Sequence, residues 1–137
     1  MARAQRFKEP LSLIVLDLDN FKLINDLNGH PTGDEVLISV GKVLLNSLRQ
    51  IDVASRWSDD EFALLLPNTS LSQALLVAEK LRTAITAELT PLQLNISASF
   101  GIVELSKDEL QIDFLRRADN ALYESKNTGR NKVSVGS

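Results

Sequence analysis

Apolar runs along the chain change their period from one segment to the next, which predicts strands and helices in mixed order. Leu11 to Leu18 is a largely apolar run, interrupted by Ser12 and bounded by Pro10 and an acidic cluster, a pattern typical of a buried central strand. Helical spacing follows over residues 21–27 and, after the turn residues 28–31, from about Thr32 to about Arg49. We therefore expect one strand followed by two helices.

The rest of the chain predicts a hairpin and then alternating helices and strands. Residues 52–57 and 62–66 are strand-like runs separated by a polar tip, which favours a hairpin. The further expected elements are a helix over 71–89, a half-buried strand over 92–102, a helix over 112–126 and a short strand over 132–135. Gly101, inside the half-buried strand, predicts a bulge or a close approach of another backbone.

The resulting order, β-α-α-β-β-α-β-α-β, contains a β-α-β-β-α-β unit once one helix and the last strand are set aside. We therefore expect an α/β fold, an α+β sandwich with a ferredoxin-like or palm-type central sheet, helices packed on that sheet and an antiparallel hairpin. A phosphoacceptor receiver domain also places acids after its first strand. It needs alternating parallel β-α units, however, which the hairpin disfavours.

Composition indicates one globular domain over residues 1–137, with 44% apolar and 24% charged residues. Lys and Arg number 15 against 18 Asp and Glu, so the net charge of −3 predicts no general attraction to nucleic acid polymers or anionic membranes. The longest apolar stretch, Leu11 to Leu16, is too short to span a bilayer, and the absence of Cys suits a reducing compartment. We expect a cytoplasmic domain without direct membrane contact.

Carboxylates gather at two turns of the expected fold. Asp17 and Asp19 lie at the exit of the first strand, and Asp59, Asp60 and Glu61 lie at the hairpin tip. If the hairpin packs beside the first strand, Asp17 and one tip acid converge on a hard cation such as Mg²⁺, an arrangement used to activate hydroxyl and phosphoryl groups. The alternative is that these acids only solvate two turns, where Asp is common in any protein.

Several spaced blocks carry a resemblance that is more specific than any one of them. The blocks are Asp17 to Asp26, Asn28-Gly29-His30, Gly33 to Leu37, Arg56 to Phe62, Ala118 to Tyr123, Lys126 and Gly129-Arg130-Asn131. Together, and in this order over nearly the whole chain, they resemble the GGDEF domains of diguanylate cyclases. The resemblance implies a nucleotidyl cyclase palm-type sheet whose hairpin carries the signature motif, here Ser58-Asp59-Asp60-Glu61-Phe62.

The resemblance also implies a cation site and a reaction. Asp17, the backbone carbonyl of Leu18 and Asp60 match the positions that hold Mg²⁺ or Mn²⁺ in the family. Asp60 and Glu61 match the catalytic acids, and Glu61 matches the position that assists the attacking 3′-hydroxyl. The family reaction joins two GTP molecules, one on each of two facing domains, into cyclic di-GMP and two pyrophosphates, which implies a homodimer for catalysis.

Substrate contacts follow from the same resemblance. Asn25 and Asp34 match the pair that hydrogen-bonds the guanine edge, a task suited to an amide and a carboxylate. Lys22, Lys126 and Arg130 match the phosphate contacts, where cations offset the triphosphate charge.

The motif departs from the family because Ser58 and Asp59 replace the signature Gly-Gly. Those glycines let the backbone turn and approach the nucleotide without a Cβ. Asp59 adds bulk and negative charge where a triphosphate is expected. Unless Asp59 turns outward or recruits a cation, GTP binding and turnover should fall.

A second nucleotide site is implied by Arg49-Gln50-Ile51-Asp52, which resembles the family's RxxD inhibitory motif five residues before Ser58. There Arg49 and Asp52 would bind guanine bases of cyclic di-GMP. The alternative is an exposed arginine near a strand-start aspartate, an ion pair of little energetic weight.

Two functions remain open from the sequence. The first is a degenerate domain that binds cyclic di-GMP at Arg49 and Asp52, or GTP, as a regulatory module. The second is an active cyclase with a variant tip.

The resemblance also implies that the domain lacks the family's usual N-terminal Asp-x-Leu-Thr segment and that sensory or effector domains are attached in the full protein. We expect His30 to be a structural turn residue, Trp57 to pack along the hairpin and Tyr123 to lie in the core.

Overall fold

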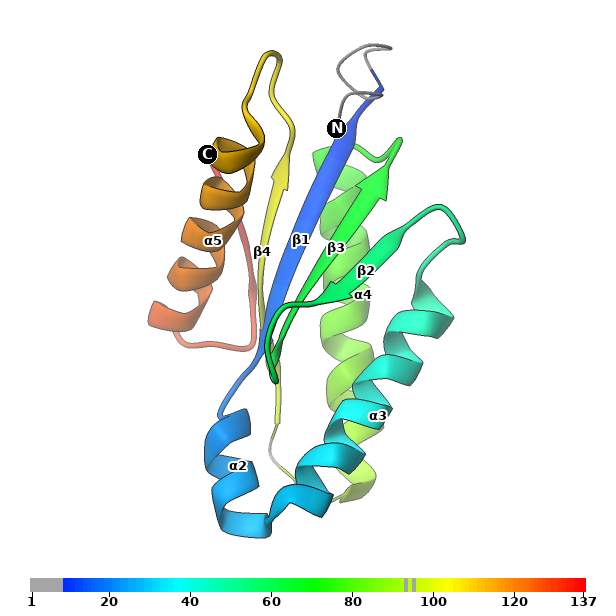
Figure 1. Ribbon diagram of the computed structural model, residues 1–137, viewed down its shortest axis with the longest axis vertical. Helices are drawn as coiled ribbons and strands as arrows, with labels where there is room; N and C mark the ends of the chain where they lie inside the picture. Colours follow the sequence, from blue (N-terminus) through cyan, green and yellow to red (C-terminus); the bar gives the residue numbers. More distant parts are fainter. Residues whose placement is uncertain (1–8, 93, 95) are drawn as a thin grey trace.

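The computed structural model describes residues 9–92, 94 and 96–137 (Figure 1). Its strands are β1 Leu11–Leu18, β2 Val53–Arg56, β3 Glu61–Pro67, β4 Ala98–Glu104 and β5 Val133–Val135. Its helices are α2 Phe21–Asn28, α3 His30–Ser47, α4 Leu71–Leu89 and α5 Gln111–Asn127, with a 3₁₀ turn at Thr90–Leu92. None of these helices is both long and apolar enough to cross a membrane.

The strands form one mixed sheet in the order β2-β3-β1-β4-β5, with β1 at its centre (Figure 1). β1 runs antiparallel to both β3 and β4, and β4 runs parallel to β5. β2 pairs only with β3, also antiparallel, so the two make the expected hairpin. The α+β fold with a palm-type sheet is confirmed.

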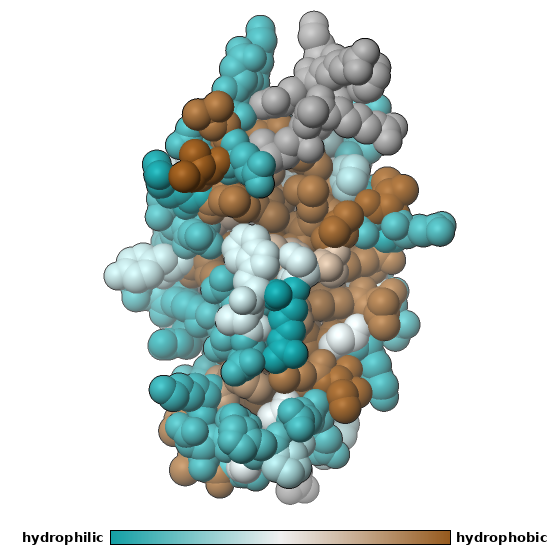
Figure 2. All heavy atoms as spheres, in the orientation of Figure 1, coloured by the Kyte–Doolittle hydropathy of each residue, from teal (hydrophilic) through white to brown (hydrophobic). Residues whose placement is uncertain are grey.

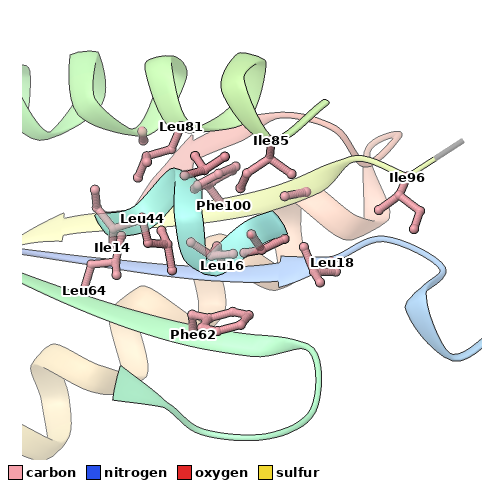
Figure 3. Packing of buried hydrophobic residues seen from close by; sticks show 14 of the residues in the cluster. Ile14, Leu16, Leu18, Leu44, Phe62, Leu64, Leu81, Ile85, Ile96 and Phe100 are labelled. Carbon is pink, nitrogen blue, oxygen red and sulfur yellow. The ribbon is translucent and has the colours of Figure 1, made fainter. Parts of the chain in front are cut away.

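Helices cover both faces of the sheet, which explains why β1 is apolar at every position except Ser12 and Asp17. Ile14 and Leu16 pack into one core with α3 and α4, whereas Leu13 and Val15 pack into a second core with α5. Because alternate residues of a strand point to opposite faces, a strand buried on both sides is apolar at nearly every position. Figure 3 shows the larger core, in which side chains of α4 meet Phe100 of β4 above Leu16.

The prediction of a strand from residue 92 to 102 is wrong at both ends. Thr90–Leu92 is a 3₁₀ turn, β4 begins at Ala98 and extends to Glu104, and residues 93 and 95 lie outside the described part of the chain. Leu94 and Ile96 pack against the larger core before the ladder begins. The alternation of Leu94 and Ile96 therefore reports that their side chains pack against the core, and not that they belong to the sheet.

The start of α3 also differs from the sequence prediction. The helix begins at His30 and not near Thr32, and Pro31 lies in its first turn. Proline is tolerated there because the first amide groups of a helix have no partner within it. Gly29 alone separates α2 from α3, with φ 89°, so the two helices meet at a sharp corner.

β4 and α5 approach each other at Gly101, as expected from the sequence. A Cβ at this position would overlap the backbone nitrogen of Leu122 and the backbone oxygen of Ala118. Ala118 and Leu122 belong to the buried side of α5.

Tyr123, which we expected in the core, is 67% exposed because it follows Leu122 on the solvent side of the helix.

Part of the sheet face that carries α5 stays open beside β2 and β3. A pocket of about 320 Å³ lies there, with Trp57, Val53 and Phe114 among its lining residues. Figure 2, in the orientation of Figure 1, shows apolar surface over this side of the molecule. Trp57 thus lies along the hairpin, as expected, and its ring remains partly exposed.

Candidate functional site

The carboxyl end of β1 and the apex of the β2–β3 hairpin lie side by side. Asp17 is the register partner of Glu61 in the β1–β3 ladder. One residue further on, the backbone N–H of Leu18 donates to the backbone carbonyl of Asp60 at 2.9 Å. The two acidic segments, more than forty residues apart in sequence, are therefore joined by main-chain hydrogen bonds.

Asp17 carries an unsatisfied carboxylate. Its side chain is 15% exposed, and Oδ2 lies 3.2 Å from Nζ of Lys126. Oδ1 is buried and has no hydrogen-bond partner among the described residues. Burial raises the pKa of Asp17 to about 7, Lys126 opposes this rise, and the neighbouring Asp60 adds to it. A carboxylate that is paired with Lys126 through one oxygen only, and that lies beside a second carboxylate, would be stabilised by a further cation at Oδ1.

The donor set fits a hard divalent cation such as Mg²⁺ or Mn²⁺. Asp17, Asp60 and the carbonyl of Leu18 are oxygen donors from adjacent backbone segments, and Leu18 and Asp60 both line the neighbouring pocket. No group of three or more acidic or imidazole side chains among the described residues is arranged to hold a metal by itself. Mg²⁺ is usually bound by one or two carboxylates together with water and substrate phosphates, so two carboxylates suffice.

Asp19 has a different environment from Asp17. It is 2% exposed, and its oxygens accept hydrogen bonds from Ser97 Oγ at 2.7 Å, Ser99 Oγ at 2.6 Å and the backbone N–H of Asn131 at 3.0 Å. Both oxygens are occupied by protein donors. Of the two acids at the exit of β1, only Asp17 has an oxygen left for a ligand.

At the hairpin apex, Asp59 points away from the site. Its side chain is 92% exposed, and its Oδ1 lies 3.4 Å from Nη2 of Arg56. Arg56 also donates to the backbone carbonyls of Ser58 at 3.0 Å and Asp59 at 3.2 Å. Both conditions that would reduce the harm from Asp59, an outward side chain and a nearby cation, are therefore met. Sequence reasoning missed Arg56, although its place three residues before Asp59 was a usable signal.

The other two acids of the apex face the site. Ser58 Oγ donates to Asp60 Oδ1 at 3.2 Å, which links the first variant position to the third. The pKa of Glu61 is raised, chiefly by burial and further by the negative charges of Asp119 and Asp60. A carboxylate with a raised pKa is a stronger proton acceptor.

A pocket of about 370 Å³ opens between α2, the apex and the end of α5. Lys22, Lys126 and Arg130, the three cations expected to contact phosphates, all line it, and so does Asp60. The carboxylates of Asp26 and Asp60 line the same cavity. Three positive side chains together with carboxylates are suited to a polyphosphate that carries a divalent cation.

The residues expected to contact guanine lie on α2 and at the start of α3. Asn25 Nδ2 is 3.1 Å from His30 Nδ1. Asn25 also packs against Gly33, where a Cβ would overlap its Oδ1. Asp34 is exposed. Neither Asn25 nor Asp34 lines the phosphate-side pocket, so they extend the site along α2 and α3.

Arg49 and Asp52, the candidate second site, bind each other. Arg49 Nη2 lies 2.7 Å from Asp52 Oδ1, and it donates to the Pro67 carbonyl at 2.8 Å and to Thr69 Oγ1 at 2.7 Å. The Asp52 side chain is only 4% exposed. Pockets of about 590 and 220 Å³ adjoin the pair, and both residues line each of them. The Arg49 side chain is 50% exposed, so the arginine is exposed as the alternative expects, whereas the aspartate is buried.

The sequence of the chain matches a known family over most of its length. The family model described as "Diguanylate cyclase, GGDEF domain" matches residues 1–132. The chain is 40% identical over 132 residues to diguanylate cyclase A of Treponema denticola, covering 93% of this chain and 36% of that protein. It is 40% identical over 122 residues to diguanylate cyclase DgcM of Escherichia coli, covering 89% of this chain and 30% of that protein. The chain thus spans about a third of the length of these relatives.

Solved structures agree with the sequence comparisons. The active GGEEF domain of a diguanylate cyclase from Vibrio cholerae matches with a TM-score of 0.93 and 36% identity, over 99% of this chain and 88% of that one. The GGDEF domain of DgcB from Caulobacter crescentus, solved in complex with c-di-GMP, matches with a TM-score of 0.87 and 33% identity, over 98% and 82% of the two chains. The mixed sheet and its helices are the palm-type nucleotidyl cyclase fold of these domains.

Proposed function

Because the chain belongs to the GGDEF family of diguanylate cyclases, which act in cyclic di-GMP signalling, we propose that it binds GTP with a divalent cation and retains the cyclase reaction despite its variant tip. One observation carries this proposal: the buried Oδ1 of Asp17 has no hydrogen-bond partner among the described residues, and the neighbouring Asp60 lines a pocket together with three cations. A domain that had lost the nucleotide would have no use for a buried carboxylate oxygen without a hydrogen-bond partner.

In the proposed complex, Asp17, Asp60 and the Leu18 carbonyl hold Mg²⁺ or Mn²⁺. The cation supplies charge stabilisation at the phosphoryl group and favours deprotonation of the attacking hydroxyl. Lys126, which contacts Asp17 in the free protein, is close enough to turn its ammonium group toward the phosphates. Glu61, whose pKa is raised, accepts a proton on the hydroxyl side of the reaction.

The remaining substrate contacts follow from the shape of the site. Lys22 and Arg130 offset the charge of the triphosphate from opposite sides of the pocket. Asn25 and Asp34 bind the guanine edge, and His30 orients the Asn25 amide through their 3.1 Å contact. Each domain holds one GTP, so condensation requires two domains facing each other in a homodimer.

The outward position of Asp59 favours the active alternative over the degenerate one. A carboxylate that points into solvent and lies beside Arg56 adds little repulsion to a triphosphate on the other side of the apex. We expect a reduced affinity for GTP compared with a glycine tip, and not a loss of activity.

Turnover tests this proposal. The purified chain, brought into dimers by a fused dimerisation domain, is incubated with GTP and Mg²⁺, and cyclic di-GMP is separated by chromatography. We expect product from the native chain, more product from Asp59→Gly, and none from Asp17→Asn. A native chain that is silent while Asp59→Gly is active would show that the variant tip abolishes the reaction.

A second function, cyclic di-GMP binding at Arg49 and Asp52, is favoured by the two pockets that meet at this pair. The DgcB domain was solved with c-di-GMP, which makes the same ligand a reasonable one here. Binding would require Arg49 to exchange its contacts to Pro67 and Thr69 for a guanine base. The full protein's attached sensory or effector domains would then sense the occupied site.

Calorimetry with cyclic di-GMP tests the second function. We expect Arg49→Ala to abolish binding and Arg116→Ala to leave it intact. Arg116 is a matched control because it forms an exposed pair with Asp113 at the same i,i+3 spacing. Equal binding by both variants would refute the assignment of the site to Arg49 and Asp52.

A further inference from the structure

Asp19 joins three segments that are far apart in the sequence. It is nearly fully buried, and its hydrogen bonds to Ser97, Ser99 and the backbone of Asn131 span 78, 80 and 112 residues. All three partners are donors, so the carboxylate acts only as an acceptor. It ties the exit of β1 to the start of β4 and to the turn that follows α5.

The turn after α5 has a conformation that needs support. Gly129, Arg130 and Asn131 all have positive φ, at 120°, 61° and 47°. A residue other than glycine in the left-handed region costs roughly 1–2 kcal/mol, and such strain persists only where surrounding contacts hold it. Asn131 has two such contacts, its backbone N–H to Asp19 at 3.0 Å and its side-chain oxygen to Arg82 at 3.0 Å.

Arg130 belongs to this strained turn and lines the phosphate-side pocket. Lys126, one turn earlier on α5, lies 3.9 Å from Asp19. The orientation of the turn therefore decides where the Arg130 guanidinium stands relative to Lys126 and Asp17.

We propose that Asp19 is a positioning residue: through the Asn131 backbone it holds the strained turn against β1 and so keeps Arg130 at the pocket. The consequence for nucleotide affinity rests on the proposed GTP binding, whereas the effect on the turn does not. Asp19 itself touches neither phosphate nor cation, because both of its oxygens are taken.

A carboxylate is required here, and an amide of the same shape does not replace it. The hydroxyl groups of Ser97 and Ser99 can rotate and accept a hydrogen bond from an amide. The N–H of Asn131 can only donate. In Asp19→Asn, an amide NH₂ placed toward Asn131 would meet another donor, and an amide oxygen placed there would lack the charge that strengthens the native bond.

Hydrogen exchange measured by NMR on the whole chain tests the role of Asp19. In Asp19→Asn we expect the Asn131 amide to exchange at least about tenfold faster, the loss expected for a hydrogen bond to a charged group, while the Ile14 amide in β1 keeps its protection. Ser99→Ala is the control, since it removes a donor from Asp19 and leaves the bond to Asn131 in place.

GTP affinity measured with Mg²⁺ tests the functional consequence. We expect Asp19→Asn to weaken binding by about the same factor as Arg130→Gln, and the double variant to be no weaker than either single one, because both changes remove the same contact.

Distinct results would overturn distinct claims. Native exchange of the Asn131 amide in Asp19→Asn refutes the positioning role, and so does fast exchange of this amide in the native chain, which is measurable even if the variant does not fold. Additive losses of GTP affinity refute the link to Arg130. A native chain that binds no GTP refutes the proposed function and leaves the exchange result to decide the role of Asp19.

Discussion

The position of the Asp59 side chain decides how strongly the variant motif affects the expected nucleotide site. Its carboxylate stands where the family signature has glycine, yet it faces solvent beside Arg56, and Arg56 also caps the carbonyls of Ser58 and Asp59. Arg56 thereby keeps the negative charge off the nucleotide side of the apex.

We predict that Arg56→Gln raises the KM for GTP by about two- to fivefold, the range that corresponds to an exposed ion pair, with little change in kcat. In an Asp59→Gly background the same substitution should have almost no effect, because no carboxylate is left to hold. Steady-state kinetics of the four proteins measures this coupling. Equal effects of Arg56→Gln in both backgrounds would mean that Arg56 acts independently of Asp59.

Individual site residues were predictable from the sequence where local pattern sets their place. Asp17 was predictable because it lies at the end of a buried strand. The pattern predicted only one unspecified acid of the hairpin tip, and the family resemblance selected Asp60. The partners of Asp19 were not, since Ser99 and Asn131 reach it across 80 and 112 residues. Spacing along the chain carries no information about such contacts.

Among the elements, the contact between β4 and α5 depends on Gly101. The backbone of α5 lies where a side chain at this position would begin, so the helix and the strand pack more closely than side chains normally allow. This close contact also sets the position of α5 along the sheet, and Lys126 of α5 contacts Asp17.

Gly101→Ala should destabilise the fold by about 1–3 kcal/mol, the usual cost of forcing atoms into a packed interior. Gly41→Ala is the matched control, because a Cβ at Gly41 meets nothing within 4 Å. Placed inside α3, that substitution should stabilise the protein by about 0.5–1 kcal/mol. Urea unfolding measures both changes, and a loss of stability of the same size in the two variants would contradict the account of the β4–α5 contact.

The loop between β4 and α5 is held by an ion pair between Glu109 and Arg117. Arg117 Nε lies 2.7 Å from Glu109 Oε2, and the Arg117 guanidinium also donates to the Glu104 carbonyl. The hydrogen bonds from Arg117 lower the pKa of Glu109. Because the folded state favours the ionised form, this stabilisation is present above the ordinary pKa of glutamate and is lost as the pH falls through the lowered value.

We therefore predict that Glu109→Gln lowers the unfolding free energy at neutral pH by roughly 1–3 kcal/mol. The difference between the variant and the native chain should shrink as the pH is lowered below 4.5, the ordinary pKa of this group. Urea unfolding across this pH range follows it. A difference that stays constant with pH would show that Glu109 contributes by packing alone.

For the molecule as a whole, the order of helices and strands along the chain was predictable, whereas the first and last residues of some strands were not. The hairpin and the split β-α-β-β-α-β order can be predicted from the sequence because apolar residues repeat with a different period in helices and in strands. The false strand start at residue 92 arose because Leu94 is partly buried and Ile96 is buried although both precede β4. Periodicity reports which side of a segment is buried and says nothing about whether it has a neighbour in the sheet.

In the fold, the end of β1, the hairpin apex and the end of α5 lie together around one pocket. Asp60 from the apex and Lys126 from α5 line this pocket, and both interact with Asp17 from β1, although no two of these elements are neighbours in the chain. We propose that Asp17 and Asp60 share a divalent cation with the phosphates of GTP.

The most direct test is the Mg²⁺ dependence of GTP-analogue affinity, measured by calorimetry at a pH above 7 so that Asp17, with its pKa of about 7, is ionised. An analogue with an uncleavable α,β-bridge prevents turnover. We predict that Mg²⁺ strengthens binding to the native chain and has little effect on binding to Asp17→Asn. The same gain from Mg²⁺ in both proteins would contradict the claim.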